Sequence, residues 1–191
     1  MVRWVPGTPD RLQHAALELF AARGYEQTTA AEIAQAVGLT ERTFFRHFSD
    51  KREVLFHGQQ LLTDAFVAGV AEAPQSASPV EFSLSALRSA SAFFPDDRRP
   101  YSRMRQSVID DNPALQEREA HKLVRLGRAL VDALTERGVD DLTADVVAQL
   151  SVMAFGIAFA RWIRADEHRS FEDVATDVVR RVGDVARQLE P

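Results

Sequence analysis

Thr29-Ala-Ala-Glu-Ile-Ala-Gln-Ala-Val-Gly-Leu-Thr-Glu-Arg-Thr-Phe-Phe-Arg-His-Phe48 contains two helix starts separated by a glycine. Thr29 and Glu32 have the T-x-x-E spacing of a capping box, which predicts that a helix begins here. Gly38 lies where that helix must stop, and Thr40 offers a hydroxyl as the N-cap of the next one. The segment therefore predicts two short helices joined by a glycine turn.

The second of these helices is expected to have two chemically different faces. Phe44 and Phe48 are one turn apart and suit a core, while Arg42 and Arg46, also one turn apart, must project from another face. A helix that is aromatic behind and cationic in front suits the DNA major groove, as in a helix-turn-helix. The alternative is an ordinary helical hairpin whose arginines are merely solvated.

The flanking sequence extends the unit to three compact helices that lead into a fourth. Upstream, Thr8-Pro9-Asp10 is a helix start with Thr8 as its cap, and Gly24 is its stop. Downstream, Ser49 is expected to cap a helix that runs from about Asp50 to Glu72 with one apolar face. Such a helix would be a rigid strut of roughly 33 Å.

The segment and its flanks resemble the TetR family of bacterial transcriptional regulators over residues 9 to about 57, through motifs such as Phe20-Ala-Ala-Arg-Gly-Tyr25 and Thr43-Phe-Phe-Arg-His-Phe48. The resemblance implies phosphate contacts and base-edge contacts. The first set is Thr29, Thr40, Phe45, His47 and Lys51, and the second is Glu41, Arg42, Thr43 and Arg46. Arg42 stands where many members carry glycine, which adds a possible guanine contact, and Phe45 replaces the commoner tyrosine.

Composition and charge set further bounds. The chain has 191 residues, 46% of them hydrophobic, a net charge of −5 and no cysteine. Disulfides and thiolate metal sites are excluded, and a cytoplasmic location is permitted. Residues 1–57 contain seven basic and seven acidic residues, so the excess acid lies in the remainder. DNA affinity must then come from local placement of cations and helix N-termini, doubled in a dimer.

The rest of the chain shows no strand-period segment. Helices are expected at about 80–94, 99–111, 113–137 and 142–165, and a last one begins at Ser170. The predicted fold is all-α with about nine helices. We expect a helix-turn-helix DNA-binding domain at residues 9–56 and a helical ligand-binding and dimerisation domain at residues 57–191.

Residues 146–160 are nearly all apolar, so the helix that contains them should be covered on almost every side. We judge it too short and too interrupted to span a membrane. Packing this helix against the apolar stripe of the last helix still leaves apolar surface exposed. This exposed surface predicts a C2 homodimer, and a dimer fits a palindromic operator. The expected dimer residues are Phe159, Trp162, Phe171, Val174, Val178, Val182 and Val185.

The centre of the second domain is rich in aromatic and flexible residues, which form either a core or an apolar ligand cavity. They include Phe66, Phe94, Tyr101, Met104, Val108, Leu126, Leu130, Met153 and Phe155. Residues 88–165 resemble the MftR-like branch of the family, through Arg103-Met-Arg-Gln and Ala160-Arg-Trp162. The branch implies a fatty acyl-coenzyme A effector, whose anionic head Arg99, Arg103 and Arg105 would bind. The alternative for these arginines is solvation or a structural ion pair.

Catalysis has little support in the sequence. The five histidines show no metal-pair spacing, and no glycine-rich phosphate loop or nucleophile constellation is present. We therefore expect neither an enzyme nor a cofactor, but a dimeric repressor that a small apolar or amphipathic ligand releases from double-stranded DNA. A helical protein-binding adaptor is the alternative, and a helical enzyme is a weaker one.

Overall fold

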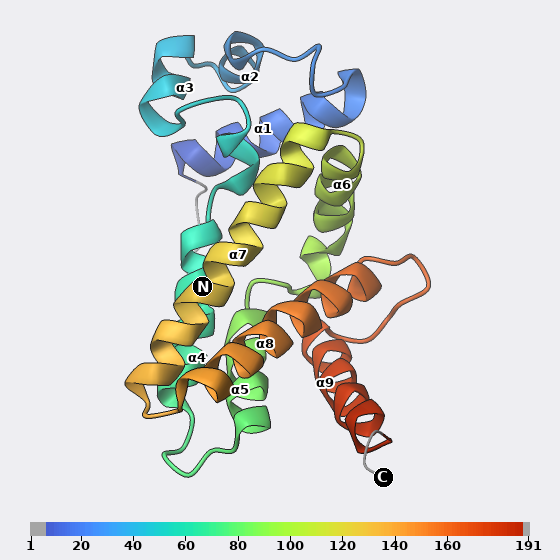
Figure 1. Cartoon of the computed structure of the whole chain (residues 1–191). Coiled ribbons are helices and arrows are strands. Elements are labelled where there is room, and N and C mark those ends of the chain that lie inside the picture. The colour runs from blue at the N-terminus through green and yellow to red at the C-terminus, as the bar shows by residue number, and fades with distance from the viewer. Residues whose placement is uncertain (1–6, 189–191) are drawn as a thin grey trace, which may run out of the picture. The chain divides into compact units, whose positions relative to one another are not determined.

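The computed structural model describes residues 7–188, and every regular element in that range is a helix (Figure 1). The α-helices are α1 (Thr8–Arg23), α2 (Ala30–Ala36), α3 (Glu41–His47), α4 (Gln59–Glu72), α5 (Pro79–Ser91), α6 (Arg99–Asp110), α7 (Pro113–Glu136), α8 (Asp141–Trp162) and α9 (Phe171–Arg187). Two short 3-10 helices are η1 (Glu53–Phe56) and η2 (Asp96–Arg98). Within the described range, the predicted all-α fold with about nine helices is confirmed.

The chain divides into two compact units, and both are discontinuous in sequence. The N-terminal unit contains the residues up to Gln59 together with Arg103–Glu119. The C-terminal unit contains Gln60–Ser102 and the residues from Ala120 onward. Helices α6 and α7 therefore contribute residues to both units, which a simple division of the sequence near residue 57 does not capture.

The helix-turn-helix segment has the caps that its sequence predicts. The Thr29 hydroxyl accepts from the Glu32 N–H at 3.2 Å, and the Glu32 carboxylate accepts from the Thr29 N–H at 2.8 Å, which lowers the pKa of Glu32. Gly38 has a φ of 74°, a conformation that glycine adopts at little cost. The Thr40 hydroxyl accepts from the Thr43 N–H at 3.3 Å. These contacts fix where α2 ends and α3 begins.

The predicted cap of α1 is wrong. Gly7, not Thr8, is the N-cap residue, and Thr8 is already helical. The Asp10 carboxylate accepts from the Gly7 N–H at 3.0 Å and satisfies the exposed end of the helix.

The predicted helix from Asp50 to Glu72 is also wrong, because it is two separate elements. The Asp50 carboxylate accepts from the N–H groups of Arg52 and Glu53, at 2.7 and 3.1 Å, and η1 follows. Gly58 then has a φ of 82°, which lies outside the helical region. The continuous helix α4 has 14 residues, so it measures about 21 Å rather than 33 Å.

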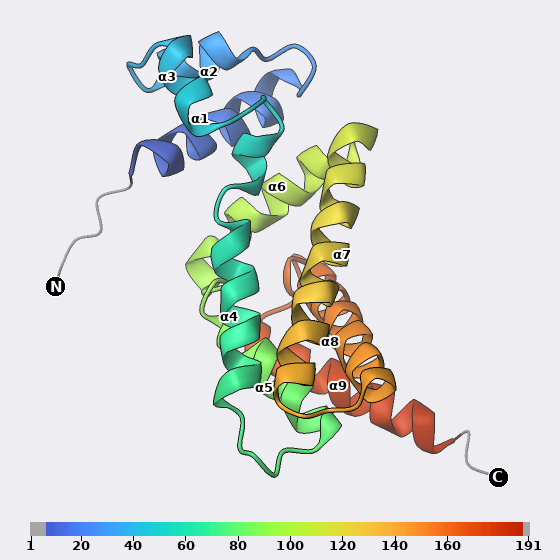
Figure 2. The same cartoon turned by 60° about the vertical axis from the view of Figure 1, so that its left-hand side comes forward.

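The core of the C-terminal unit is built around α8, which packs against α5 and α9 (Figure 2). Small residues allow close packing: the hydroxyls of Ser83 and Ser151 lie 2.9 Å apart between α5 and α8, and Gly69 of α4 faces the backbone of α5. The largest buried side chains of this core include Phe66, Leu87, Leu130, Trp162 and Phe171.

Helix α8 is less covered than its sequence predicts. Leu142, Val146, Met153 and Ile157 are all exposed in the single chain. By length and composition α8 could cross a bilayer, so the argument that it is too short for a membrane span is wrong. Its other face carries Ala144, Val147, Ala148, Ala154, Phe155, Ala158 and Trp162 in the core of the unit, which accounts for its apolar composition without a membrane.

Candidate nucleic-acid interface

Helix α3 has the two faces expected of a recognition helix. Phe44 is fully buried and Phe48 nearly so, with their ring centroids 5.3 Å apart. Arg42 and Arg46 are exposed, and in the described part of the chain neither forms a hydrogen bond or an ion pair. A short helix held from behind by two aromatic rings thus presents two uncommitted guanidinium groups, which suit guanine edges or phosphates.

The other cations of the module already have partners within the chain. Arg23 pairs with Glu32 at 3.4 Å, and Arg52 pairs with Asp50 at 3.0 Å. The Arg11 guanidinium donates to the carbonyl of Val37 at 2.8 Å. Arg42 and Arg46 therefore differ from the remaining arginines of residues 8–57 in having no competing contact.

Lys51, an expected phosphate contact, is held against Tyr25. Its Nζ donates to the Tyr25 carbonyl at 2.7 Å and lies 4.0 Å from the centre of the ring. Burial of the Tyr25 side chain raises the pKa of its phenol to about 12. Two of the three ammonium protons of Lys51 remain available, so the contact positions the group without consuming it.

The other expected DNA-contacting residues lie on α3 or at the N-caps of α2 and α3. Thr29 and Thr40 are the helix caps, and the Thr43 hydroxyl lies 3.0 Å from that of Thr40. Glu41 and His47 are exposed, and Phe45 is 51% exposed. The ring of Phe45 packs edge-to-face against that of Phe44, with the centroids 5.4 Å apart, and leaves its other side to solvent.

A second cluster holds η1 against the residues that α6 and α7 contribute to the same unit. Two guanidinium groups lie over the ring of Phe56, that of Arg105 at 5.1 Å and that of Arg118 at 4.7 Å from its centre. Arg118 forms a two-point pair with Glu53 at 2.6 and 2.9 Å, and Arg105 pairs with Glu119 at 2.8 Å. We refer to these five residues as the Phe56 clamp.

The clamp changes how Arg105 is interpreted. Its guanidinium also donates to the carbonyl of Leu55 at 3.0 Å, so the group is committed to this unit rather than available for an anionic ligand. Sequence reasoning missed Glu53 and Arg118, which are 65 positions apart. The sequence carries no signal for such a pair, because both are common surface residue types.

Arg99, the second arginine expected to bind ligand, is buried in the C-terminal unit and makes three hydrogen bonds within the chain. Its guanidinium donates to Asp96 at 2.5 Å, to the carbonyl of Arg169 at 2.8 Å and to the carbonyl of Glu167. It also lies 5.0 Å from the ring of Trp162. These contacts hold the loop after α8 and commit much of the guanidinium group to the chain itself.

The remaining expected ligand residues divide between the two units. Phe66, Phe94 and Phe155 form one aromatic cluster in the C-terminal unit, with ring centroids 5.4 and 5.7 Å apart. Leu126 and Leu130 are buried in the core of that unit, Tyr101 is half-buried, and Met153 faces solvent. The other three belong to the N-terminal unit, where Val108 is buried and Arg103 and Met104 are exposed.

The residues expected at a dimer contact are mostly inside the single chain. Trp162, Phe171, Val174 and Val178 are buried in the core of the C-terminal unit. Phe159 and Val182 are partly covered, and Val185 is 61% exposed. The apolar stripe of α9 thus covers α5 and α8 of its own chain.

Two family models match the sequence. Residues 12–57 match the bacterial regulatory proteins of the tetR family, and residues 77–187 match the MftR C-terminal domain. The chain belongs to the TetR family. The resemblance of both parts of the sequence to this family and to its MftR branch is confirmed.

Two relatives agree with this assignment. MftR of Mycobacterium tuberculosis is 28% identical over 181 residues, which cover 90% of this chain and 89% of that protein. The HTH-type transcriptional regulator TcmR of Streptomyces glaucescens is 43% identical over 81 residues. That match covers 42% of this chain and only 36% of TcmR.

Solved structures share the fold. PfmR, a TetR family transcriptional regulator of Thermus thermophilus, is 25% identical, covers 90% of this chain and 96% of its own, and has a TM-score of 0.51. FadR of the same species, a repressor solved in complex with lauroyl-CoA, is 23% identical with coverages of 90% and 91% and a TM-score of 0.51. The family and the relatives with which this chain is compared are transcriptional regulators, not enzymes.

Proposed function

We propose that this TetR family regulator is a repressor that binds a palindromic operator as a homodimer in the cytoplasm. The observation that carries the proposal is α3, with Arg42 and Arg46 exposed and uncommitted above the buried Phe44 and Phe48. Thr29 and Thr40 cap the N-termini of α2 and α3, and helix N-termini attract phosphate through their backbone N–H groups. Two such modules on a C2 axis match the symmetry of a palindrome.

For the effector we propose a small ligand with an acyl chain. The support is the cluster of Phe66, Phe94 and Phe155 in the C-terminal unit, since apolar and aromatic side chains line such sites. FadR of Thermus thermophilus, which shares the fold, was solved with lauroyl-CoA. Because Arg99 and Arg105 are committed to partners within the chain, we assign recognition to the acyl chain rather than to those guanidinium groups.

Release would follow from a difference in ligand affinity between two conformations of the dimer. Helices α6 and α7 contribute residues to both compact units, so a change in the C-terminal unit can travel along them. At their N-terminal-unit ends, Arg105 and Arg118 hold Phe56 just before Gly58 and α4. The coupling would change the spacing of the two recognition helices, which must match about 34 Å of DNA.

The test uses DNA fragments that flank the protein's own gene, with binding measured by fluorescence anisotropy. We expect specific binding that the Arg42→Ala, Arg46→Ala double variant loses, while Arg23→Ala, which removes a paired arginine, keeps it. Saturating lauroyl-CoA should weaken binding at least about tenfold, the size of a typical allosteric coupling. Equal operator affinity with and without the ligand would refute the effector class and leave DNA binding standing.

A further inference from the structure

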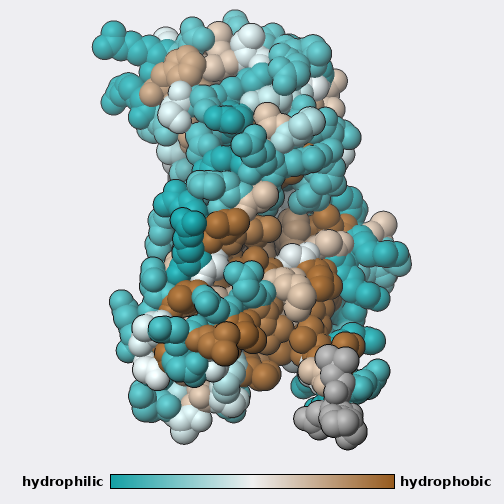
Figure 3. Space-filling model, in the orientation of Figure 1, coloured by the Kyte–Doolittle hydropathy of each residue, from teal (hydrophilic) through white to brown (hydrophobic). Residues whose placement is uncertain are grey.

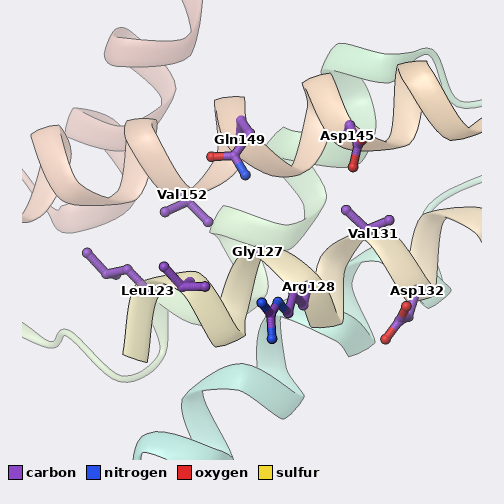
Figure 4. Close-up of a pocket in the computed structure, with 9 residues that line it drawn as sticks. Leu123, Gly127, Arg128, Val131, Asp132, Asp145, Gln149 and Val152 are labelled. Carbon is purple, nitrogen blue, oxygen red and sulfur yellow. The ribbon is translucent and has the colours of Figure 1, made fainter. Parts of the chain in front are cut away.

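A groove between α7 and α8 of the C-terminal unit offers an acyl chain too little cover. Its volume is about 450 Å³, it opens to solvent, and Arg128, Asp132 and Asp145 line it beside Leu123 and Val152 (Figure 4). Hydrophobic residues also gather on the surface of this unit (Figure 3), but exposed side chains do not enclose a ligand. Small-molecule sites bury most of the ligand surface among apolar side chains. The aromatic core of the same unit fits this requirement better than the groove.

Phe94 has ring contacts with four other aromatic side chains of that core. Between ring centroids, the distances from Phe94 are 4.6 Å to Phe171, 5.6 Å to Phe159 and 5.7 Å to both Phe155 and Trp162. Phe155, Trp162 and Phe171 are buried, whereas Phe94 is only partly buried. Because one side of the Phe94 ring contacts buried rings and part of it contacts solvent, this ring forms part of the wall around them.

Phe94 also differs from these four neighbours in the backbone that carries it. The other four rings belong to α8 and α9, but Phe94 lies in the non-helical segment between α5 and η2. Its N–H donates to the carbonyl of Ser91 at 2.9 Å, and Arg99 holds the chain just after η2 through its bond to the carbonyl of Arg169. The backbone is thus fixed on both sides of Phe94. Its ring can still turn away by rotation about side-chain bonds, which is fast for a residue that reaches solvent.

We propose that Phe94 is a movable wall of the effector site, and that its ring turns outward when an acyl chain enters the aromatic core. The inference rests on the proposed function, because it locates the entry for the ligand class proposed there. Methylene groups of the chain take over the contacts that Phe94 makes with Phe155 and Phe171, so one apolar group replaces another. A polar ligand would leave its own polar groups unpaired among these rings. The exchange therefore selects a hydrocarbon chain.

The test measures lauroyl-CoA binding by isothermal titration calorimetry. A ring that must leave first lowers the apparent affinity by the fraction of molecules that are open, so Phe94→Ala should bind at least about tenfold more tightly. Phe94→Leu, which keeps part of the side chain, should show a smaller gain in the same direction. Free coenzyme A should gain nothing, because it has no acyl chain. Phe82→Ala is the matched control: Phe82 is buried at the opposite end of α5, under the Arg137 guanidinium, and its loss should leave the affinity unchanged.

Trp162 supplies a second readout that does not depend on affinity. The chain has two tryptophans, and Trp4 lies outside the described residues, so Trp4→Phe leaves Trp162 as the only tryptophan. Acrylamide should quench Trp162 more strongly in Phe94→Ala than in the unchanged chain, because the ring beside the indole is missing. Lauroyl-CoA should restore the protection, because its acyl chain fills the same place.

The outcomes separate the movable wall from the proposed effector. Circular dichroism checks that the variants fold, and Phe94→Leu decides the question if Phe94→Ala does not. Lauroyl-CoA binding that is no tighter in the Phe94 variants, an equal gain in Phe82→Ala, or equal quenching of Trp162 with and without the Phe94 ring would overturn the movable wall. Each of these results leaves the effector class standing if the unchanged chain binds lauroyl-CoA. Failure of every protein to bind lauroyl-CoA would overturn both.

Discussion

Replacing Arg42 and Arg46 together with alanine should flatten the salt dependence of operator binding. Both guanidinium groups are exposed and have no partner in the described chain, so they can displace the cations that surround DNA. Arg23 is paired with Glu32 and Arg52 with Asp50, so these two arginines should displace few of the cations that surround DNA. The effect of removing an arginine therefore depends on its partner, not on its charge alone.

The structure sets the size of the effect. A dimer of the double variant lacks four uncommitted cations, and at about 0.9 per contact the slope of log affinity against log salt falls by about 3.6. Between about 50 and 200 mM salt, the unchanged protein should lose about 150-fold more affinity than the variant. Fluorescence anisotropy titrations at four or more salt concentrations give both slopes. Every protein in this comparison carries Arg3→Ala, so that this cation, which lies outside the described residues, does not contribute to the slope.

The paired arginines supply the control. Arg23→Ala with Arg52→Ala removes the same number of cations, yet should change the slope by less than about one. If this pair lowers the slope as much as the α3 pair does, the reasoning from free and committed guanidinium groups is refuted. Equal slopes for the unchanged protein and the α3 variant would refute the assignment of α3 as the DNA-facing helix.

Two further outcomes follow from packing and titration. Gly69→Ala should lower the free energy of unfolding by about 1–3 kcal/mol in urea denaturation, because its Cβ would lie 2.5 Å from the Ser85 carbonyl oxygen and 2.7 Å from the Ala86 Cα. Gly156→Ala, with nothing within 4 Å of its Cβ, should instead gain up to about 1 kcal/mol, and equal effects would contradict the close α4–α5 contact. For Tyr25, whose buried phenol has a pKa of about 12, stability should fall as pH rises above about 10, since the unfolded chain releases the proton first. The loss approaches 1.4 kcal/mol per pH unit, and Tyr25→Phe should remove it from alkaline urea titrations, whereas parallel curves for the two proteins would argue against the buried phenol.

The local signals in the sequence predicted most of the helix-turn-helix. Thr29, Glu32 and Thr40 act through contacts within three residues, so residue type and spacing are sufficient to identify them. The sequence did not predict the break before α4, because Asp50 can cap a 3-10 turn as well as a helix. The positive φ of Gly58 was not predicted either, because hydrophobic periodicity carries no information on the sign of φ.

Contacts to distant backbone atoms were beyond sequence reasoning. Arg99 and Arg105 looked like anion-binding residues, yet they donate to carbonyls of Arg169 and Leu55, and a carbonyl has no signature in the sequence. The exposure of α8 had a similar cause. An apolar helix predicts that something covers it, but periodicity cannot tell a neighbouring helix of the same chain from a second molecule.

The Phe56 clamp limits how the DNA-binding module can be joined to other sensor domains. The recognition module is completed by residues 103–119, which lie within the region that matches the MftR C-terminal domain. Joining residues 1–59 to an unrelated sensor domain would leave Phe56 without the two guanidinium groups that lie over its ring. A functional chimera must therefore also contain Arg105, Arg118 and Glu119. The complete DNA-binding module is thus encoded by two separate stretches of the gene.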